Sequence, residues 1–469
     1  MKILLILAAA DNDPLRKNDP FMPLSLPLLA GSAPNHEYTF IDMLAGEPID
    51  FECDAELIGI SARATGETAA YQIADSFRNR GKTVILGGPQ ISAVYDRAIE
   101  HADACVIGEG EKLWPQIIDD YQHNALKKFY IAIPGPFDNK GLPFFQLPSF
   151  TDLSQDIPLE PLRKPYKRKY VFDTVFAARG CPVQCEFCSV TDLFGAKIRT
   201  RPIDSVVKEI AAFKGFYYLL DDTVFGRPSN YDYYCSLYDK ITSETKGELW
   251  MGQANLDAAA TKEGQKVIIK AAQAGLVYAA IGIESINTDV LQQSSPIDKT
   301  GALDSGDVIR RFEELISFIQ QQGIFISGWF PVGFDGDSYE TVRHNFRFCR
   351  KTGIAPVLSP LEALPGTRLF TRLSKSNRID SKKPINIIHP QMEDKKLIEI
   401  IDTGMKKAYT LSEILRRSFS FARYANVHNK NINLKIKNYI KKTSFIIILQ
   451  LKMRKGLYGL MNTLNQTST

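Results

Sequence analysis

The sequence predicts an α/β protein: an N-terminal Rossmann-like, doubly wound parallel sheet, then a partial or full (β/α) TIM-type barrel, then a helical C-terminal region. Two observations predict this fold class. Short apolar runs alternate with helix-compatible stretches over most of the chain, which is typical of parallel strands joined by crossover helices. A proline-rich stretch with little periodicity divides these runs into two series. We therefore expect domains at 1–125 and 169–375, a connector at 126–168 and a helical region at 376–469.

The first series predicts five strands, at 2–8, 38–42, 57–61, 83–87 and 104–107, with helix-compatible stretches such as 66–80 and 93–100 between them. The opening apolar run resembles a secretion leader, but it breaks at once into Asp11, Asn12 and Asp13, so a buried strand is the better interpretation. Ligands of an open parallel sheet bind beyond the carboxyl ends of its strands. The turns there supply the candidate ligand cradle: Ser61, Gly87, Gly88, Gly108, Glu109, Gly110 and Glu111. The alternative for each glycine is that it only permits a tight turn.

The second series predicts strands at 170–177, 215–220, 248–254, 278–283, 325–330 and 356–360. In (β/α) barrels functional groups gather at the carboxyl ends of the strands. The residues expected there are Cys181, Cys185, Cys188, Asp221, Asp222, Gln253, Asn255, Glu284, Ser285 and the turn 333–335.

The three cysteines have the spacing C-x-x-x-C-x-x-C, with Phe187 just before the last one. Three thiolates on one loop can hold three irons of a cubane cluster and leave the fourth iron open to a substrate or second cofactor. A structural zinc site usually has four ligands in two pairs, and no second pair or histidine pair lies nearby. A disulfide framework suits small secreted proteins, and chance clustering of buried thiols is the remaining alternative.

Composition sets the other limits. The net charge of +4 is too small to indicate a nucleic-acid partner, and a reducing cytoplasm fits all seven cysteines. From Ile414 onward the chain has no Asp or Glu but many Lys and Arg, and its apolar run at 444–451 is too short to span a bilayer. We expect a cytoplasmic protein with possible peripheral membrane contact through this basic region. The alternatives are a solvated basic face on terminal helices or a loosely ordered tail.

Over residues 1–375 the sequence resembles the radical S-adenosylmethionine (SAM) superfamily, in particular its members with an N-terminal cobalamin-binding-type domain. The cysteine motif matches that superfamily in full. Weaker segments follow in the expected order: 219–225 (LLDDTVF), 250–257, 282–285 (GIES), 333–335 (GFD) and 364–367 (LPGT). The D-x-H-x-x-G motif of the best-known cobalamin binders is missing, because neither His36 nor His101 has that context.

This resemblance implies that the three cysteines hold a 4Fe–4S cluster whose open iron chelates SAM, and that the reduced cluster cleaves SAM to methionine and a 5′-deoxyadenosyl radical. Asp221 or Asp222 would receive the methionine ammonium group, and Gln253, Asn255 and Glu284 would orient ribose and adenine, unless these three only line the barrel. The cradle of the first domain would bind cobalamin. The electron would come from a reductant such as flavodoxin or ferredoxin.

The leading functional hypothesis is a cobalamin-dependent methyltransferase that acts on an unactivated carbon of a small-molecule or lipid-like substrate. The alternatives are a radical cyclisation, oxidation or rearrangement on the same architecture, and a non-catalytic cobalamin or iron–sulfur sensor. The sequence does not choose the substrate.

Overall fold

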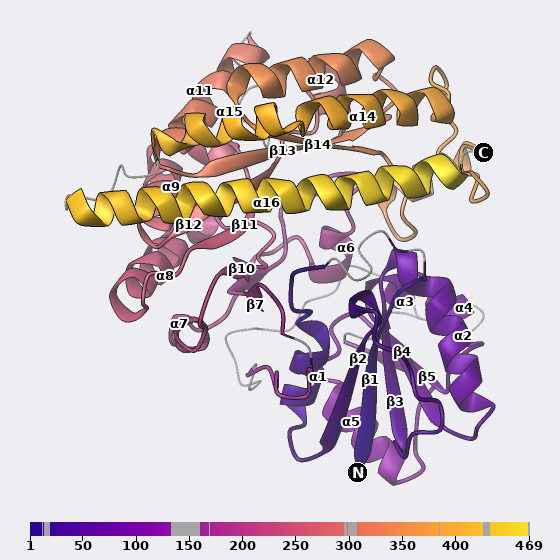
Figure 1. Cartoon of the computed structure of the whole chain (residues 1–469). Helices are drawn as coiled ribbons and strands as arrows, with labels where there is room; N and C mark the ends of the chain where they lie inside the picture. The colour runs from indigo at the N-terminus through magenta and orange to yellow at the C-terminus, as the bar shows by residue number, and fades with distance from the viewer. Residues whose placement is uncertain are drawn as a thin grey trace.

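The computed structural model describes residues 1–11, 13, 19–132, 160–167, 169–294, 298, 307–383, 385–424 and 432–467. Figure 1 shows two sheet-containing parts and a layer of C-terminal helices. The predicted fold class is confirmed. The predicted connector lies largely outside the described residues. Its described part packs on the first domain, where Leu162 N–H donates to the carbonyl of Pro27 at 2.9 Å and Tyr166 Oη to that of Pro23 at 3.0 Å.

The first sheet has six parallel strands in the order β2-β1-β3-β4-β5-β6. Their bounds are β1 Lys2–Ala8, β2 Glu37–Asp42, β3 Leu57–Ala62, β4 Thr83–Gly87, β5 Ala104–Ile107 and β6 Phe129–Ile131. In this order the chain reverses direction across the sheet between β1 and β3, which is where doubly wound sheets bind ligands. The sixth strand was not expected from the sequence, and it extends the sheet beyond residue 125.

Helices cover both faces of this sheet, which explains why β1 is apolar along its length. Ile3, Leu5 and Leu7 pack in the same core as Trp114, whereas Leu4 and Ile6 lie in the core of the opposite face. The helices are α1 Ser25–Ser32, α2 Glu67–Arg78, α3 Pro89–Ala93, α4 Tyr95–Ala98 and α5 Trp114–Gln122. The helix expected at 93–100 is instead two short helices, because the backbone leaves helical geometry at Val94 (φ −133°).

The second sheet also has six parallel strands, in the sequential order β7-β10-β11-β12-β13-β14. Their bounds are β7 Asp173–Val175, β10 Tyr217–Leu219, β11 Trp250–Ala254, β12 Leu276–Gly282, β13 Phe325–Val332 and β14 Ala355–Pro360. The edge strands β7 and β14 do not pair within the described residues, so the barrel is a partial one. A two-stranded hairpin, β8 Ala178–Arg179 with β9 Arg199–Thr200, follows β7 and was not predicted.

Helices follow these strands in the chain, and their bounds are α6 Val190–Phe194, α7 Ile203–Ala211, α8 Tyr231–Glu244, α9 Lys262–Gln273, α10 Thr288–Ser294, α11 Val308–Gln321 and α12 Tyr339–Thr352. One face of the sheet packs against them, as Trp250 does against Tyr238 of α8 (ring centroids 5.4 Å apart). Paired residues of parallel strands share a face, so the strand register places Tyr218, Gln253, Tyr278, Ser327 and Trp329 on the opposite face. We call this the inner face.

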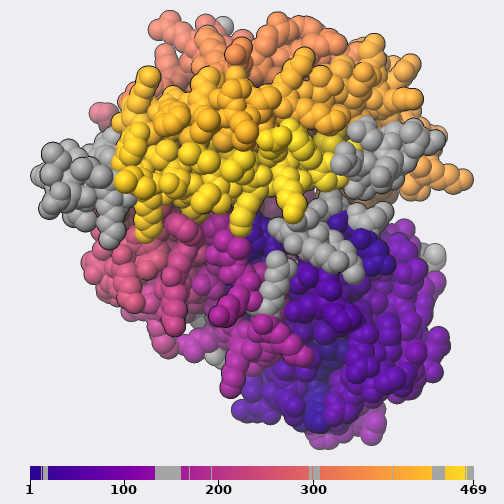
Figure 2. All heavy atoms as spheres, in the orientation of Figure 1, coloured from indigo at the N-terminus to yellow at the C-terminus, as the bar shows by residue number. Residues whose placement is uncertain are grey.

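The C-terminal helices are α13 Arg368–Lys375, α14 Asp394–Ala408, α15 Leu411–Ala422 and α16 Ile432–Thr467. In Figure 1, α14 and α15 follow one another and both lie along α16, and Figure 2 shows α16, in yellow, along the surface. On its other side α16 belongs to the barrel core, where Phe445, Ile446 and Leu449 are buried. The described part of the tail is therefore packed rather than loosely ordered. Among the described residues, no helix combines the length and apolarity needed to cross a membrane.

Candidate functional site

The cysteine loop follows the first barrel strand and is fixed by hydrogen bonds from three elements. Cys181 N–H donates to the carbonyl of Gly195, at the end of α6, at 3.0 Å. Glu186 N–H donates to Ser294 of α10, and Leu369 N–H of α13 donates to the carbonyl of Glu186 at 2.9 Å. These contacts hold the loop in one shape at the carboxyl edge of the sheet, as the sequence predicted.

Gln184, within the loop, has a φ of +56°, which is rare for a residue other than glycine. The Arg368 guanidinium donates to its carbonyl oxygen, and Phe187 packs edge-on against Phe334 (ring centroids 5.6 Å apart). Sparsely populated backbone conformations persist only where surrounding contacts impose them, and they concentrate at functional sites.

The thiols differ in burial. Cys185 is 8% exposed, whereas Cys181 and Cys188 are partly exposed. Burial raises the pKa of the Cys181 thiol, and the Arg227 charge partly offsets this rise. In the described part of the chain, no three His, Cys, Asp or Glu side chains are arranged to hold one metal ion. Each thiolate of a cubane cluster binds a different iron, so a cluster loop does not need such convergence.

The adjacent Asp221 and Asp222 follow strand β10 but contact different groups. Asp221 is fully buried: its Oδ1 accepts the N–H groups of Ala177 and Ala178 at 2.7 and 3.0 Å, and its Oδ2 accepts the Tyr234 hydroxyl at 2.8 Å. Burial raises the pKa of Asp221 to about 7. Both carboxylate oxygens are therefore used, and Asp221 ties the start of β8, which leads into the cysteine loop, to helix α8.

Asp222 Oδ2 accepts the N–H of Gly180, the residue before Cys181, at 2.9 Å. Burial raises the pKa of Asp222 to about 6, although Gly180 N–H, Arg179 and Arg199 oppose the rise. Of the two carboxylates, Asp222 is the one beside the cysteine loop.

Gln253 and Asn255, which close strand β11, also differ. Gln253 is exposed on the inner face, near the Tyr218 hydroxyl. Asn255 is buried; it accepts the Thr223 hydroxyl and donates to Asp257 at 2.6 Å. Asn255 thus braces neighbouring loops, and Gln253 is the freer of the two to meet a ligand.

Glu284, after β12, is 5% exposed and has a φ of +65°. Its N–H and that of Ile283 both donate to the carbonyl of Trp329, at 3.0 Å each. This strained turn brings Glu284 to the same sheet edge as the cysteines.

The strand-end turns of the first domain lie together, as expected. The hydroxyl of Ser92 donates to Gly88 O at 2.9 Å and accepts Gly108 N–H at 3.0 Å. A Cβ on Gly88 (φ +99°) would lie 2.8 Å from the Ser61 hydroxyl oxygen. The glycines at 88 and 108 therefore allow these turns to pack on one another. This packing explains both glycines without a bound ligand.

Glu109, predicted in the cobalamin cradle, contacts the second domain instead. Its carboxylate pairs with both terminal nitrogens of Arg199 at 2.9 Å and with Arg179 at 2.9 Å. Arg179 also pairs with Glu111 at 2.6 Å and lies over the Phe176 ring, 4.4 Å from its centroid. We call Glu109, Glu111, Arg179 and Arg199 the interdomain ion network. All four side chains are at most 13% exposed.

Sequence reasoning missed three of these features: Arg179, Arg199 and Trp329. Trp329 is 45% exposed on the inner face, and its indole donates to Ser327 Oγ at 3.0 Å. The alternation Ser327, Trp329 in an otherwise apolar strand was the available signal. The histidines of the first domain lie elsewhere: His36 precedes β2, and His101 precedes β5 and pairs with Asp75 at 2.9 Å.

Comparison with known proteins finds similar chains among methyltransferases and cobalamin-dependent radical enzymes. The chain is 26% identical over 413 residues to the bacteriochlorophyllide d C-12(1)-methyltransferase of Chlorobaculum tepidum, and the alignment covers 84% of each chain. It is similar in structure to TsrM from Kitasatospora setae, a radical SAM methyltransferase solved with cobalamin and a [4Fe-4S] cluster (TM-score 0.63, 17% identity, 80% of this chain and 78% of that one).

It is also similar to OxsB, a cobalamin-dependent SAM radical enzyme (TM-score 0.65, 16% identity, 96% of this chain and 72% of that one). These similarities support the resemblance to the radical SAM superfamily that the sequence shows. The shared fold, including the N-terminal parallel sheet, agrees with the resemblance to members that have a cobalamin-binding-type domain. A search of protein-family models finds no match.

Proposed function

We propose that this radical SAM enzyme is a cobalamin-dependent methyltransferase that acts on an unactivated carbon. The observation that carries the proposal is the interdomain ion network. Glu109 leaves the strand-end turns of the cobalamin-type domain and pairs with Arg179, two residues before Cys181. The two candidate cofactor sites are therefore joined by direct, buried contacts, as a reaction that uses both cofactors on one substrate requires.

The residues fit the implied cofactors. Three thiols on a fixed loop suit a 4Fe–4S cluster, and the turns after β3, β4 and β5 suit a corrinoid at the ligand-binding edge of a doubly wound sheet. When bound, the cluster supplies the electron that cleaves SAM to methionine and a 5′-deoxyadenosyl radical, and cobalamin carries the methyl group. The protein supplies binding, orientation and exclusion of water.

The site residues are then assigned as follows. Cys181, Cys185 and Cys188 are the metal ligands. Asp222 accepts a charge-assisted hydrogen bond from the ammonium group of SAM. It is assigned this role because it lies beside the cysteine loop, whereas both oxygens of Asp221 already accept hydrogen bonds within the protein. Gln253 and Glu284 orient the rest of SAM, and Asn255 acts indirectly, through Thr223 and Asp257.

The substrate we propose is a large, mostly apolar small molecule, such as a tetrapyrrole. The relative from Chlorobaculum acts on a bacteriochlorophyllide, by its name. In this chain, Trp329 and Leu220 are exposed at 45% and 38% at or next to the inner-face strand ends, where aromatic and aliphatic surface suits a flat apolar ring system. In the reaction the substrate carbon would give its hydrogen atom to the 5′-deoxyadenosyl radical, which becomes 5′-deoxyadenosine, and would gain the methyl group that cobalamin supplies.

Two partners complete the proposal. A one-electron reductant such as flavodoxin or ferredoxin supplies the electron. Peripheral membrane contact is supported by exposed apolar residues on the basic C-terminal helices, Leu411, Leu415 and Phe419 on α15 and Ile440 and Ile448 on α16.

The test is anaerobic. The protein is reconstituted with iron, sulfide and cobalamin, then given SAM labelled in its methyl group, a reductant and a bacteriochlorophyllide, and 5′-deoxyadenosine and product label are measured. We expect both, with the Cys185→Ala variant giving neither. Deoxyadenosine without label in the product would indicate radical cyclisation, oxidation or rearrangement instead. If a fully iron-loaded protein gave neither signal, the sensor hypothesis would replace this one.

A further inference from the structure

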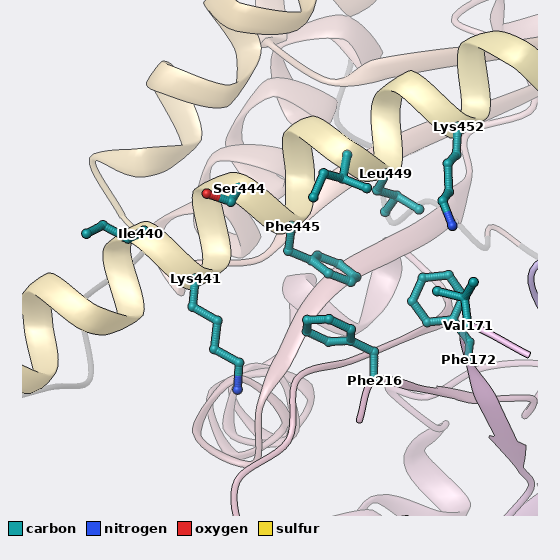
Figure 3. A pocket seen from close by; sticks show the side chains of 10 residues that line it. Val171, Phe172, Phe216, Ile440, Lys441, Ser444, Phe445, Leu449 and Lys452 are labelled. Atoms are coloured by element: carbon teal, nitrogen blue, oxygen red, sulfur yellow. The ribbon is translucent and has the colours of Figure 1, made fainter. Parts of the chain in front are cut away.

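A groove of about 300 Å³ lies between α16 and the barrel sheet (Figure 3). Val171 and Phe172, which precede β7, and Phe216, which precedes β10, form one wall. These residues lie at the amino ends of the strands, whereas the cysteine loop lies at the carboxyl ends. The groove is therefore separate from the candidate active site.

The floor of the groove is aromatic. Phe445 of α16 packs against Phe216 (ring centroids 4.5 Å apart) and edge-on against Phe172 (6.1 Å). Phe172 and Phe445 are 3% and 5% exposed, so they are fixed by packing. The rim, by contrast, exposes apolar side chains: Val171, Ile440 and Ile448 are more than half exposed. Exposed apolar side chains around a groove are typical of a binding surface.

Two lysines of α16 flank this apolar surface. The ammonium group of Lys441 lies 5.9 Å from the Phe216 ring centroid, and that of Lys452 lies 5.8 Å from the ring centroid of Phe172. Figure 3 shows both lysine side chains directed toward the aromatic floor, one on each side of Phe445. Among the described residues, no carboxylate forms an ion pair with either lysine, and α16 contains no acidic residue. The groove thus combines an apolar floor with two ammonium groups that have no acidic partner on their own helix.

We propose that this groove binds an anionic phospholipid of a membrane surface, with part of an acyl chain on the aromatic floor and the phosphate beside Lys441 and Lys452. Charge complementarity favours a lipid, since an acyl chain satisfies the apolar floor and a phosphate satisfies the lysines. The inference goes beyond the proposed radical chemistry and does not depend on it. It deepens the proposed membrane contact by naming the residues and the lipid class.

The experiment is flotation of the full-length protein with vesicles of phosphatidylcholine alone or mixed with phosphatidylglycerol. We expect binding to the anionic vesicles, reduced more than about fivefold by Lys452→Glu, which reverses one charge at the surface. Ile448→Asp should reduce binding comparably, because it places a charge on the rim. Both changes are at surface side chains, so the fold is retained, which thermal unfolding checks.

Matched controls carry the same kinds of substitution on barrel helices away from the groove. They are Lys262→Glu on α9 and Ile309→Asp on α11, where the side chain of Ile309 is 43% exposed. Both should bind like the unmodified protein. Dodecyl phosphate below its critical micelle concentration should compete with the vesicles, and inorganic phosphate should not. The proposal is overturned if the protein ignores anionic vesicles, if Lys262→Glu weakens binding as much as Lys452→Glu, if Ile448→Asp has no effect, or if phosphate alone competes.

Discussion

At the scale of single residues, Asp221 and Asp222 show how burial divides the roles of neighbouring carboxyl groups. Asp221 receives three hydrogen bonds in the interior, and Asp222 receives one beside the cysteine loop. The sequence offered both as partners of SAM. The structure favours Asp222, because a ligand that reached Asp221 would have to displace its hydrogen bonds to Ala177, Ala178 and Tyr234.

The first prediction concerns pH. Burial raises the pKa of Asp221 from its ordinary value near 3.8 to about 7, so folding favours its protonated form. Its contribution to the free energy of unfolding is fully present below pH 3.8 and is lost as the pH rises through about 7. Asp221→Asn cannot ionise and keeps the Oδ1 acceptor, so we expect its stability to fall less over this range. Urea unfolding at pH 4, 5.5 and 7.5 measures this. The prediction is contradicted if the free energy of unfolding changes with pH as steeply in Asp221→Asn as in the unmodified protein.

The second prediction concerns the cysteines. Cys185→Ala removes one of three proposed ligands on one loop, so we expect iron content after reconstitution to fall to background. Cys349→Ala is the control, since Cys349 is fully buried in the core of the barrel, far along the chain from the loop. Iron and sulfide analysis with the visible spectrum checks both. Normal iron in Cys185→Ala would contradict the cluster assignment.

At the scale of elements, the β8–β9 hairpin positions the cysteine loop. Gly180, between β8 and Cys181, has a φ of +100°, and a Cβ there would lie 2.3 Å from the carbonyl oxygen of Lys197. The hairpin was not predicted, because each of its strands has only two residues. Its role is visible only once Arg179 and Arg199 are seen side by side, paired in register.

The third prediction follows from this geometry. Gly180→Ala should destabilise the protein by roughly 2–4 kcal/mol, because it combines an unfavourable φ with a backbone clash, and it should lower cluster loading. Gly81→Ala is the matched control: its φ is +72°, but no atom lies within 4 Å of the added Cβ. Gly81→Ala should lower the free energy of unfolding by only about 1 kcal/mol. Equal unfolding midpoints for the two variants would rule out the clash.

At the scale of the whole molecule, two features join the domains and the tail into one unit. The interdomain ion network buries four charges between the domains, and α16 completes the barrel core. Buried ion pairs add little net stability, but loss of one partner is costly, because the other charge is left buried.

The fourth prediction therefore concerns Glu109→Gln. It leaves Arg199 and Arg179 short of a buried negative charge, so we expect a loss of roughly 3 kcal/mol. If the proposed function holds, deoxyadenosine should still form while methyl transfer falls more than tenfold. Glu52→Gln, at a surface pair whose carboxylate is 80% exposed, is the control and should change neither. Equal losses of the two products would mean that the network supports only the fold.

The fifth prediction compares two isoleucines of α16. Ile446 is fully buried and Ile448 is 54% exposed. Ile446→Ala should lower the free energy of unfolding, measured in urea, by roughly 2–4 kcal/mol. Ile448→Ala should lower it by less than about 0.5 kcal/mol. Similar small costs would show that α16 is a detachable tail.

By itself the sequence determined the fold class, the five longer strands of the first sheet, the six strands of the second and the cysteine loop, because apolar periodicity and cysteine spacing are local properties. It placed Asp221, Asp222, Gln253, Asn255 and Glu284 at strand ends, where the structure has them. Only the tertiary structure decided which of these side chains are already paired, that Glu109 belongs to an interdomain network, and that a basic tail packs into the core. These depend on contacts between residues far apart in the chain, such as Glu109 with Arg199 or Phe172 with Phe445, and no local pattern encodes such partners.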